Sequence, residues 1–132
     1  KEDFIKATLQ SIAYQVRDII DTMQVDAQTA IQVLKVDGGA AMNNFLMQFQ
    51  ADILGVPVIR PKVVETTALG AAYAAGIAVG FWSGEQDVVD NWAEDKRWLP
   101  SMEPAEVDRQ YRLWKKAVSR TLEWVDEDVP TA

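Results

Sequence analysis

The chain has 132 residues, 48% of them hydrophobic and 25% charged, a formal net charge of −7, and neither Cys nor His. A chain of this length can form one globular domain that buries roughly two thirds of its unfolded surface. The acidic balance, without a basic stripe, argues against nucleic acid as a partner, and the missing Cys and His exclude disulfides, thiolate or imidazole catalysis and conventional zinc sites.

The first predicted element is a long helix, because apolar residues recur at steps of three and four on one face. These residues are Ile5, Leu9, Ile12, Val16, Ile19 and Met23. The chain opens with Lys1-Glu2-Asp3 and no initiator Met, so we expect it to be cut from a longer polypeptide.

A mostly buried strand is predicted over residues 31–36, which are rich in β-branched side chains and precede a Gly-Gly pair.

A second helix is predicted to begin near Ala41 and to stop at Gly55, since Gly commonly ends a helix. Residues 56–61 have Pro near both ends and are expected to form a short extended segment. Thr66 or Thr67 is expected to cap a third helix. Residues 65–67 could instead hydrogen-bond a ligand, but the helix cap is favoured.

The third helix is built of small residues and should therefore pack centrally against a neighbouring backbone. The nearly uncharged stretch 66–84 lacks the bulky apolar content of a membrane span, which needs about 20 such residues. We therefore expect no membrane partner, and the absence of Cys fits a cytoplasmic location. An acidic excursion with one short helix follows over residues 85–95, then an extended segment over 96–100 and a last helix that begins near Pro104.

The alternation of helices and strands favours an α/β unit with parallel strands and right-handed crossovers. Two predicted strands do not make a sheet, so we expect further strands upstream. Residues 1–132 are predicted to be a single partial domain, with an α/β part over 1–84 and an acidic excursion plus C-terminal helix over 85–132. A bare sheet edge would invite pairing between copies of the chain.

The segment at residues 36–44, called the Gly-Gly corner below, carries the most chemical information. Gly38 and Gly39 can adopt backbone angles closed to other residues, and without side chains a ligand can lie directly on their peptide groups. The helix that follows would direct its free N–H groups and positive dipole end to the same place. Asn43, expected in the first helical turn, can donate and accept hydrogen bonds. A nucleotide site is favoured over a plain tight turn.

At this corner a hydrophobic residue, Asp37, two Gly and two small residues resemble the adenosine motif of the actin-like ATPases, which have a ribonuclease H-like fold. The longer string over residues 37–48 is similar to the FGGY carbohydrate kinases, and among them to those that phosphorylate glycerol. Residues 8–15, 65–73 and 76–82 support this resemblance. It extends over nearly the whole chain and thins after Trp82.

The resemblance implies a kinase of two actin-like domains with ATP in the cleft between them, and places this chain at the end of the second domain. It implies that Gly39 and Asn43 contact the adenine nucleotide, ATP or ADP, and that Gly38 and Ala40 line the same wall. Mg²⁺ would arrive with the nucleotide, and glycerol would be bound through the missing N-terminal domain. The full-length enzyme is expected to be a homo-oligomer.

The family's catalytic Asp, polyol-binding residues and first phosphate loop match nothing in this sequence. We therefore name no catalytic and no metal-binding residue, and we expect the isolated chain to be inactive. Two alternatives stay open: another FGGY sugar kinase, of the xylulose or gluconate type, and a non-catalytic nucleotide-binding or interaction module. A fold alone does not establish activity.

Overall fold

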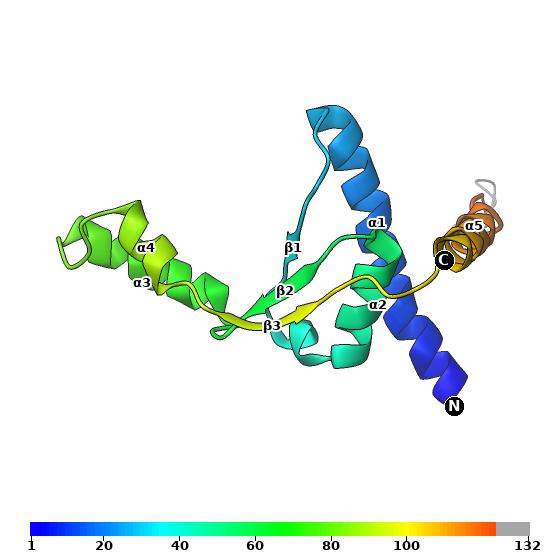
Figure 1. The fold of residues 1–132 in the computed structure, drawn as a ribbon, viewed down its shortest axis with the longest axis horizontal. Coiled ribbons are helices and arrows are strands. Elements are labelled where there is room, and N and C mark those ends of the chain that lie inside the picture. Colours follow the sequence, from blue (N-terminus) through cyan, green and yellow to red (C-terminus); the bar gives the residue numbers. More distant parts are fainter. Residues whose placement is uncertain (124–132) are drawn as a thin grey trace, which may run out of the picture. The chain divides into compact units, whose positions relative to one another are not determined.

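The computed structural model describes residues 1–123, and every structural statement below concerns that range. The chain forms two compact units, residues 1–101 and a second unit that starts at Met102. The elements in chain order are α1 (Glu2–Ala27), β1 (Leu34–Lys35), the 3₁₀ helix η1 (Gly39–Met42), α2 (Asn44–Leu54), β2 (Val58–Pro61), α3 (Thr66–Ala78), α4 (Glu85–Asn91), β3 (Glu94–Trp98) and α5 (Pro104–Ser119) (Figure 1).

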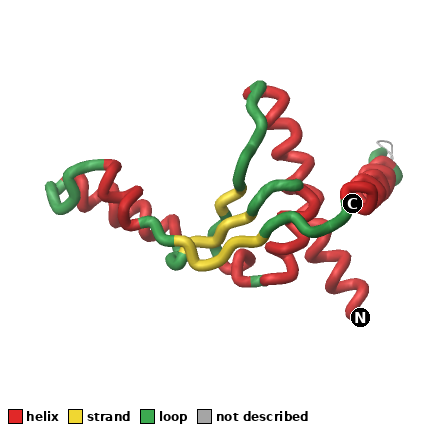
Figure 2. Tube along the Cα trace, viewed as in Figure 1, coloured by secondary structure: helices red, strands yellow, loops and turns green. Residues whose placement is uncertain are grey.

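The first unit contains a three-stranded sheet in the order β1-β2-β3, with helices beside it (Figure 2). β1 pairs with β2 in parallel, with Leu34 opposite Val58, as the α/β prediction requires. β3 pairs with β2 antiparallel, with Trp98 also opposite Val58, so the sheet is mixed. The predicted partial α/β domain is confirmed, and its sequence-predicted parallel pair is joined by an antiparallel strand.

β2 is the central strand, and all four of its residues are buried. Pro61 lacks an N–H group and is therefore an unusual member of a central strand. The pairing with β3 becomes irregular between Arg60 and Pro61, where the ladder skips a residue of β3. This bulge accommodates the proline at the end of the strand. The extended segment predicted at residues 56–61 is thus confirmed. It forms the central strand of the sheet, although its two prolines are more typical of an edge strand.

The strand predicted at residues 31–36 is much shorter than expected. β1 comprises two residues, of which Leu34 is half-buried and Lys35 is exposed. Within the described residues β2 is its sole ladder partner. A strand with one neighbour has fewer ladder hydrogen bonds to fix its ends, so the prediction of a mostly buried strand over six residues was wrong in length and burial.

The core of the first unit lies where α2 packs between α1 and the sheet. Tyr14 of α1 meets Phe49 of α2 edge-on, with ring centroids 5.4 Å apart. Arg17 of α1 donates from Nη1 to the Ile53 carbonyl at 3.0 Å. The buried hydrophobic residues are Ala13, Ala41, Leu46, Met47, Phe49, Ala51, Ile53, Val58, Ile59 and Trp98. Both predicted helices therefore form. The apolar stripe predicted for α1 is largely exposed, since Ile5, Ile12, Ile19 and Met23 are exposed and Ala13 is the one buried residue of this helix, whereas most of α2 is buried.

Gly55 ends α2 as the sequence predicts. Its φ of 69° lies in the left-handed region, and its N–H donates to the Ala51 carbonyl at 2.9 Å. Glycine adopts this conformation at the end of a helix without the steric cost that a Cβ atom brings.

α3 differs from its prediction in two respects. Its N-cap is Glu65, without a side-chain cap hydrogen bond, and the hydroxyl of Thr66 instead donates to the Asp37 carboxylate. No residue of α3 is buried, whereas its small residues predicted a central position. A helix that is apolar on every side usually needs cover on every side. Within the described residues one side of the helix, at Thr66, Leu69 and Tyr73, is half-buried and lines a hollow with Asn91 and Trp92, and most of the rest of its surface is exposed.

The C-terminal end of α3 is closed by an aromatic contact. A Cβ atom built on Gly76 would lie 2.2 Å from Cε3 of Trp82, so the indole ring occupies the space that a side chain there would need. Tyr73 and Phe81 flank the same ring, with centroid distances of 4.7 and 4.9 Å. The glycine is therefore required by close approach rather than by its backbone angles.

The short helix predicted in the acidic segment is α4, and Asp87 in its first turn stabilises its start. The Ser83 hydroxyl and the Ser83 N–H donate to Asp87 Oδ2 at 2.8 and 2.6 Å. These hydrogen bonds favour the carboxylate and hold the pKa of Asp87 below its ordinary value, with the hydroxyl as the largest cause.

We expect the start of α4 to loosen in acid. A carboxyl whose folded pKa is depressed contributes stability that is fully present above its unfolded pKa of about 4 and is lost as the pH falls through the lower folded pKa. NMR titration should show Asp87 and the Ser83 amide changing together, below the pH at which an ordinary Asp titrates. Asp87→Asn should remove the Ser83 transition. An Asp87 carboxyl that titrates at the ordinary value would contradict this assignment.

The second unit contains α5, which starts at Pro104 as predicted. Glu106 in its first turn accepts hydrogen bonds from Arg109 and Gln110, which lower the pKa of Glu106 to about 2. The acidic tail that the sequence predicts after Glu123 lies outside the described residues. Among the helices that the structure describes, none combines the length and apolar content needed to cross a membrane.

Candidate functional site

Backbone hydrogen bonds on both sides of Asp37 tie the Gly-Gly corner to β2 and to the loop that follows β2. The Val36 N–H donates to the Ile59 carbonyl at 3.0 Å, and the Gly38 N–H donates to the Val64 carbonyl at 2.9 Å. The corner therefore starts from a fixed place beside the central strand. Beyond it the chain turns through η1 into α2.

The two glycines have different roles. Gly38 has φ 74° and ψ 178°, a combination that is essentially restricted to glycine. Gly39 lies outside the left-handed region, and a Cβ atom built on it would meet nothing within 4 Å. Neither the conformation nor the packing of the described chain thus requires glycine at position 39. Its effect is to leave the peptide surface beside the exposed Ala40 open to a ligand.

Asn43 joins η1 to α2 and is the N-cap of α2 rather than a residue of its first turn. Its Oδ1 accepts from the Leu46 N–H at 3.1 Å, and its backbone carbonyl accepts from the Met47 N–H at 3.0 Å. The predicted helix start near Ala41 was therefore wrong, because a separate 3₁₀ turn precedes the cap. The cap uses the amide oxygen, so the Nδ2 group is the part of this exposed side chain that a ligand can meet.

Gly38, Gly39, Ala40 and Asn43 thus lie together on one continuous turn, as the sequence predicts. The last three are exposed, and together the four residues make up the candidate site. Within residues 1–123 no group of three or more His, Cys, Asp or Glu side chains is placed to hold a metal ion. The arrangement offers backbone peptide groups and one amide, which can position a ligand but cannot transfer protons to it.

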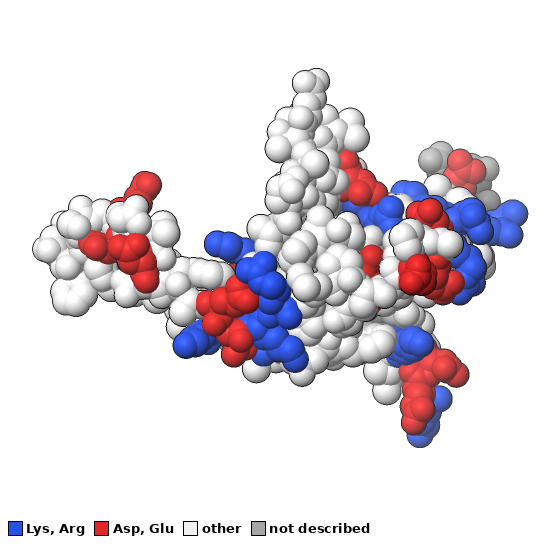
Figure 3. Space-filling view, in the orientation of Figure 1, with Lys and Arg blue, Asp and Glu red and all other residues white. Residues whose placement is uncertain are grey.

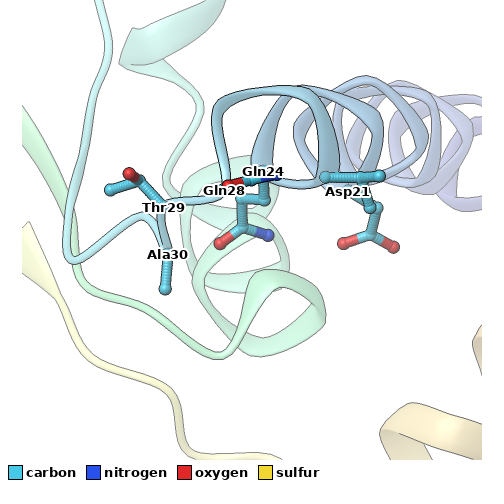
Figure 4. A pocket seen from close by; sticks show the side chains of 6 residues that line it. Asp21, Gln24, Gln28, Thr29 and Ala30 are labelled. Carbon is cyan, nitrogen blue, oxygen red and sulfur yellow. The ribbon is translucent and has the colours of Figure 1, made fainter.

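An apolar hollow of about 260 Å³ lies beside the corner, between α1, β1 and α2. Its lining residues are Ile12, Val16, Leu34, Lys35, Val36, Asp37, Ala40, Ala41, Leu46, Met47 and Gln50. A larger hollow of about 470 Å³ is formed by the C-terminal end of α1 and the turn after it, including Asp21 and Gln28 (Figure 4). It shares no lining residue with the Gly-Gly corner, so its size does not mark the candidate site.

Few Lys or Arg side chains lie near the candidate site to bind a phosphate group. Residues 63–95 contain no Lys or Arg, and Figure 3 shows Asp and Glu without basic groups over the α3–α4 part of the chain. Nζ of Lys35 lies 4.2 Å from the centroid of the Trp92 ring, a cation–π contact that holds it near β3. Any nucleotide at the corner would therefore be held mainly by backbone and amide groups.

Sequence reasoning missed Arg60, whose Nη1 donates to the Ala41 carbonyl within the corner at 3.0 Å. The contact joins residues 19 positions apart, and no local pattern indicates it. A single Arg in an otherwise apolar, proline-ended strand was the available signal, because a buried guanidinium must find partners.

The part of the chain that contains the Gly-Gly corner is similar to known proteins. Residues 1–79 match the C-terminal domain of the FGGY family of carbohydrate kinases. The glycerol kinase of Beutenbergia cavernae is 64% identical over 124 residues, which are 94% of this chain and 25% of that protein. The crystal structure of Plasmodium falciparum glycerol kinase with ADP superposes with a TM-score of 0.78 at 33% identity, covering 89% of this chain and 24% of that one.

The xylulose kinase of Lactobacillus acidophilus shares the fold, with a TM-score of 0.71 at 20% identity over 89% of this chain and 24% of that one. The chain therefore spans about a quarter of the length of the relatives that it matches. With more than half of its residues matched by the family and its corner built as described, the chain belongs to the FGGY family of carbohydrate kinases, in their C-terminal domain.

Proposed function

We propose that this chain supplies the adenine-nucleotide wall of a glycerol kinase, which transfers the γ-phosphoryl group of ATP to a glycerol hydroxyl and yields glycerol 3-phosphate and ADP. The observation that carries this proposal is the open turn from Gly38 to Asn43, whose second glycine serves no packing purpose in the described chain. The relative of known structure that was solved with ADP supports it, at 33% identity.

In this proposal Gly39 lets the nucleotide lie on the peptide backbone, and Asn43 donates from its amide nitrogen. Gly38 gives the turn its shape, and Ala40 lines the same surface. These groups position the nucleotide and move no proton. Mg²⁺ comes with the nucleotide and neutralises charge on its phosphates. Glycerol is held by the rest of the kinase.

The substrate is proposed from sequence identity, because the fold does not choose between sugars and glycerol. The glycerol kinase relative is 64% identical, whereas the xylulose kinase and a gluconate kinase of Lactobacillus acidophilus are each 20% identical. A substrate panel on the complete kinase, with glycerol, xylulose and gluconate, decides between them. A cytoplasmic, homo-oligomeric enzyme with residues 1–132 at the end of its second domain is part of the same proposal.

The isolated 132-residue chain is proposed to be inactive, because its site has one side. The assay is ATP-dependent formation of glycerol 3-phosphate by the purified chain. Formation of product above background would refute this part of the proposal.

Two variants of Asn43 separate its cap from its proposed contact with the nucleotide. Ser is about as good an N-cap as Asn, so Asn43→Ser should keep the urea midpoint of the chain, whereas Asn43→Ala should cost about 1 kcal/mol. Both should raise the KM for ATP of the complete kinase roughly tenfold, the effect of losing about 1.4 kcal/mol of binding. An unchanged KM for ATP in Asn43→Ser would remove the nucleotide role of this residue.

A further inference from the structure

Arg60 is a buried charged residue whose three guanidinium nitrogens each donate a hydrogen bond. It is 8% exposed and lies in the central strand β2. Its Nη1 donates to the Ala41 carbonyl at 3.0 Å, while Nε and Nη2 donate to Asp95 Oδ2 at 2.8 and 2.5 Å. Its Cζ atom lies 5.2 Å from the ring centroid of the buried Trp98.

Asp95 is placed for this contact by the bulge in β3. Arg60 lies opposite Lys96 and Pro61 lies opposite Glu94, so Asp95 is the residue of β3 that the ladder skips. A bulge re-aims a side chain in this way. The Asp95 side chain is 42% exposed, and it still fixes one edge of the guanidinium while the opposite edge faces the Gly-Gly corner.

The 3₁₀ turn that Arg60 contacts is held at its two ends, by the bond of the Gly38 N–H to Val64 and by the cap bonds of Asn43, and Arg60 holds it between them. η1 is four residues long, and the backbone bonds around it run from the Ala41 N–H to the Gly38 carbonyl and from the Asn43 N–H to the Ala40 carbonyl, both at 3.1 Å. These bonds shape the turn but do not attach it to the sheet. The Arg60 contact does, at the buried Ala41.

We infer that Arg60 is a positioning residue: held by Asp95, it fixes η1 against the sheet and thereby sets the surface that Gly39 and Asn43 present to the nucleotide. The inference rests on the function proposed for the corner. Arg is needed because its planar fork reaches a carbonyl and a carboxylate at the same time, which the single ammonium group of Lys does not reproduce.

The first test needs no nucleotide. In the 132-residue chain, Arg60→Lys and Asp95→Asn should speed amide hydrogen exchange at Ala41 and Asn43 at least about tenfold, while the Gly55 amide at the far end of α2 keeps its rate. Arg97→Lys is the matched control. Arg97 lies in the neighbouring strand, is half-exposed and pairs with Glu94 of its own strand. Equal exchange at Ala41 in Arg60→Lys and Arg97→Lys would overturn the inference.

The second test uses the complete kinase. Arg60→Lys should raise the KM for ATP roughly tenfold and leave kcat and the KM for glycerol within about twofold, as expected for lost uniform binding of one substrate. Arg97→Lys should change none of them. If Asn43→Ser raises the KM for ATP and Arg60→Lys does not, the positioning role is overturned and the proposed function stands. If neither variant raises it, the proposed function itself falls.

Discussion

Replacing Gly39 by Val is expected to raise the KM for ATP of the complete kinase by about 10- to 100-fold, which corresponds to a loss of about 1.4–2.7 kcal/mol of binding. The physical reason is that the Cβ and both methyl groups would stand where the nucleotide lies on the peptide surface. Steady-state kinetics with ATP as the varied substrate measure the effect. The KM for glycerol should stay within about twofold.

The neighbouring glycine provides the matched control for this result. Within the chain, a Cβ atom at Gly39 meets nothing within 4 Å, so Gly39→Val should change the free energy of unfolding by no more than about 0.5 kcal/mol. Gly38→Val forces a β-branched residue to φ 74° and should cost about 1–3 kcal/mol. Urea unfolding of the 132-residue chain compares the two. A Gly39→Val chain as unstable as Gly38→Val would mean that the fold, and not a ligand, requires glycine at position 39.

Replacing Leu46 by Ala is expected to destabilise the chain by about 2–5 kcal/mol. Leu46 is 2% exposed, lies on α2 and faces the core, so its removal loses buried apolar surface and leaves a cavity. Stabilities of whole domains are about 5–15 kcal/mol, which makes this a large fraction. The urea midpoint, at an unchanged slope with denaturant, reports the loss.

Ile5 on α1 is the control for Leu46, since it is also a large aliphatic residue of a helix but is 59% exposed. Ile5→Ala should change the unfolding free energy by about 0.5 kcal/mol or less, because surface substitutions have small effects and Ala is a good helix former. Similar midpoints for the two variants would show that α2 is not the core element of this unit.

The exposure of α3 bears on how the chain is used. Its residues are apolar on all sides, and none is buried among residues 1–123. The chain spans about a quarter of the length of its relatives, and we expect α3 to be covered by other parts of a complete kinase. β1 is an edge strand of the sheet among the described residues, and its free edge is expected to be covered in the same way. Pairing of two copies at that edge stays a prediction, which the oligomeric state of the isolated chain tests.

The sequence by itself determined the local structure. The three-and-four spacing predicts α1, Gly55 predicts the end of α2, and Pro104 predicts the start of α5, because each of these signals acts through residues within one or two turns. The Gly-Gly corner was also found from sequence, since a predicted strand, two glycines and Asn43 at the start of a predicted helix follow one another closely in the chain. The predicted site residues therefore lie on one turn in the structure.

The tertiary structure decided what depends on residues far apart in the chain. It made β2 the central strand and set β3 antiparallel to it, which no local pattern fixes because strand order depends on the register of distant segments. It brought Arg60 to the Ala41 carbonyl across 19 residues and to Asp95 across 35. It also separated the roles of the two glycines: the backbone angles of Gly38 need glycine, while at Gly39 the open space beside the turn is the reason, and only packing in three dimensions reveals open space.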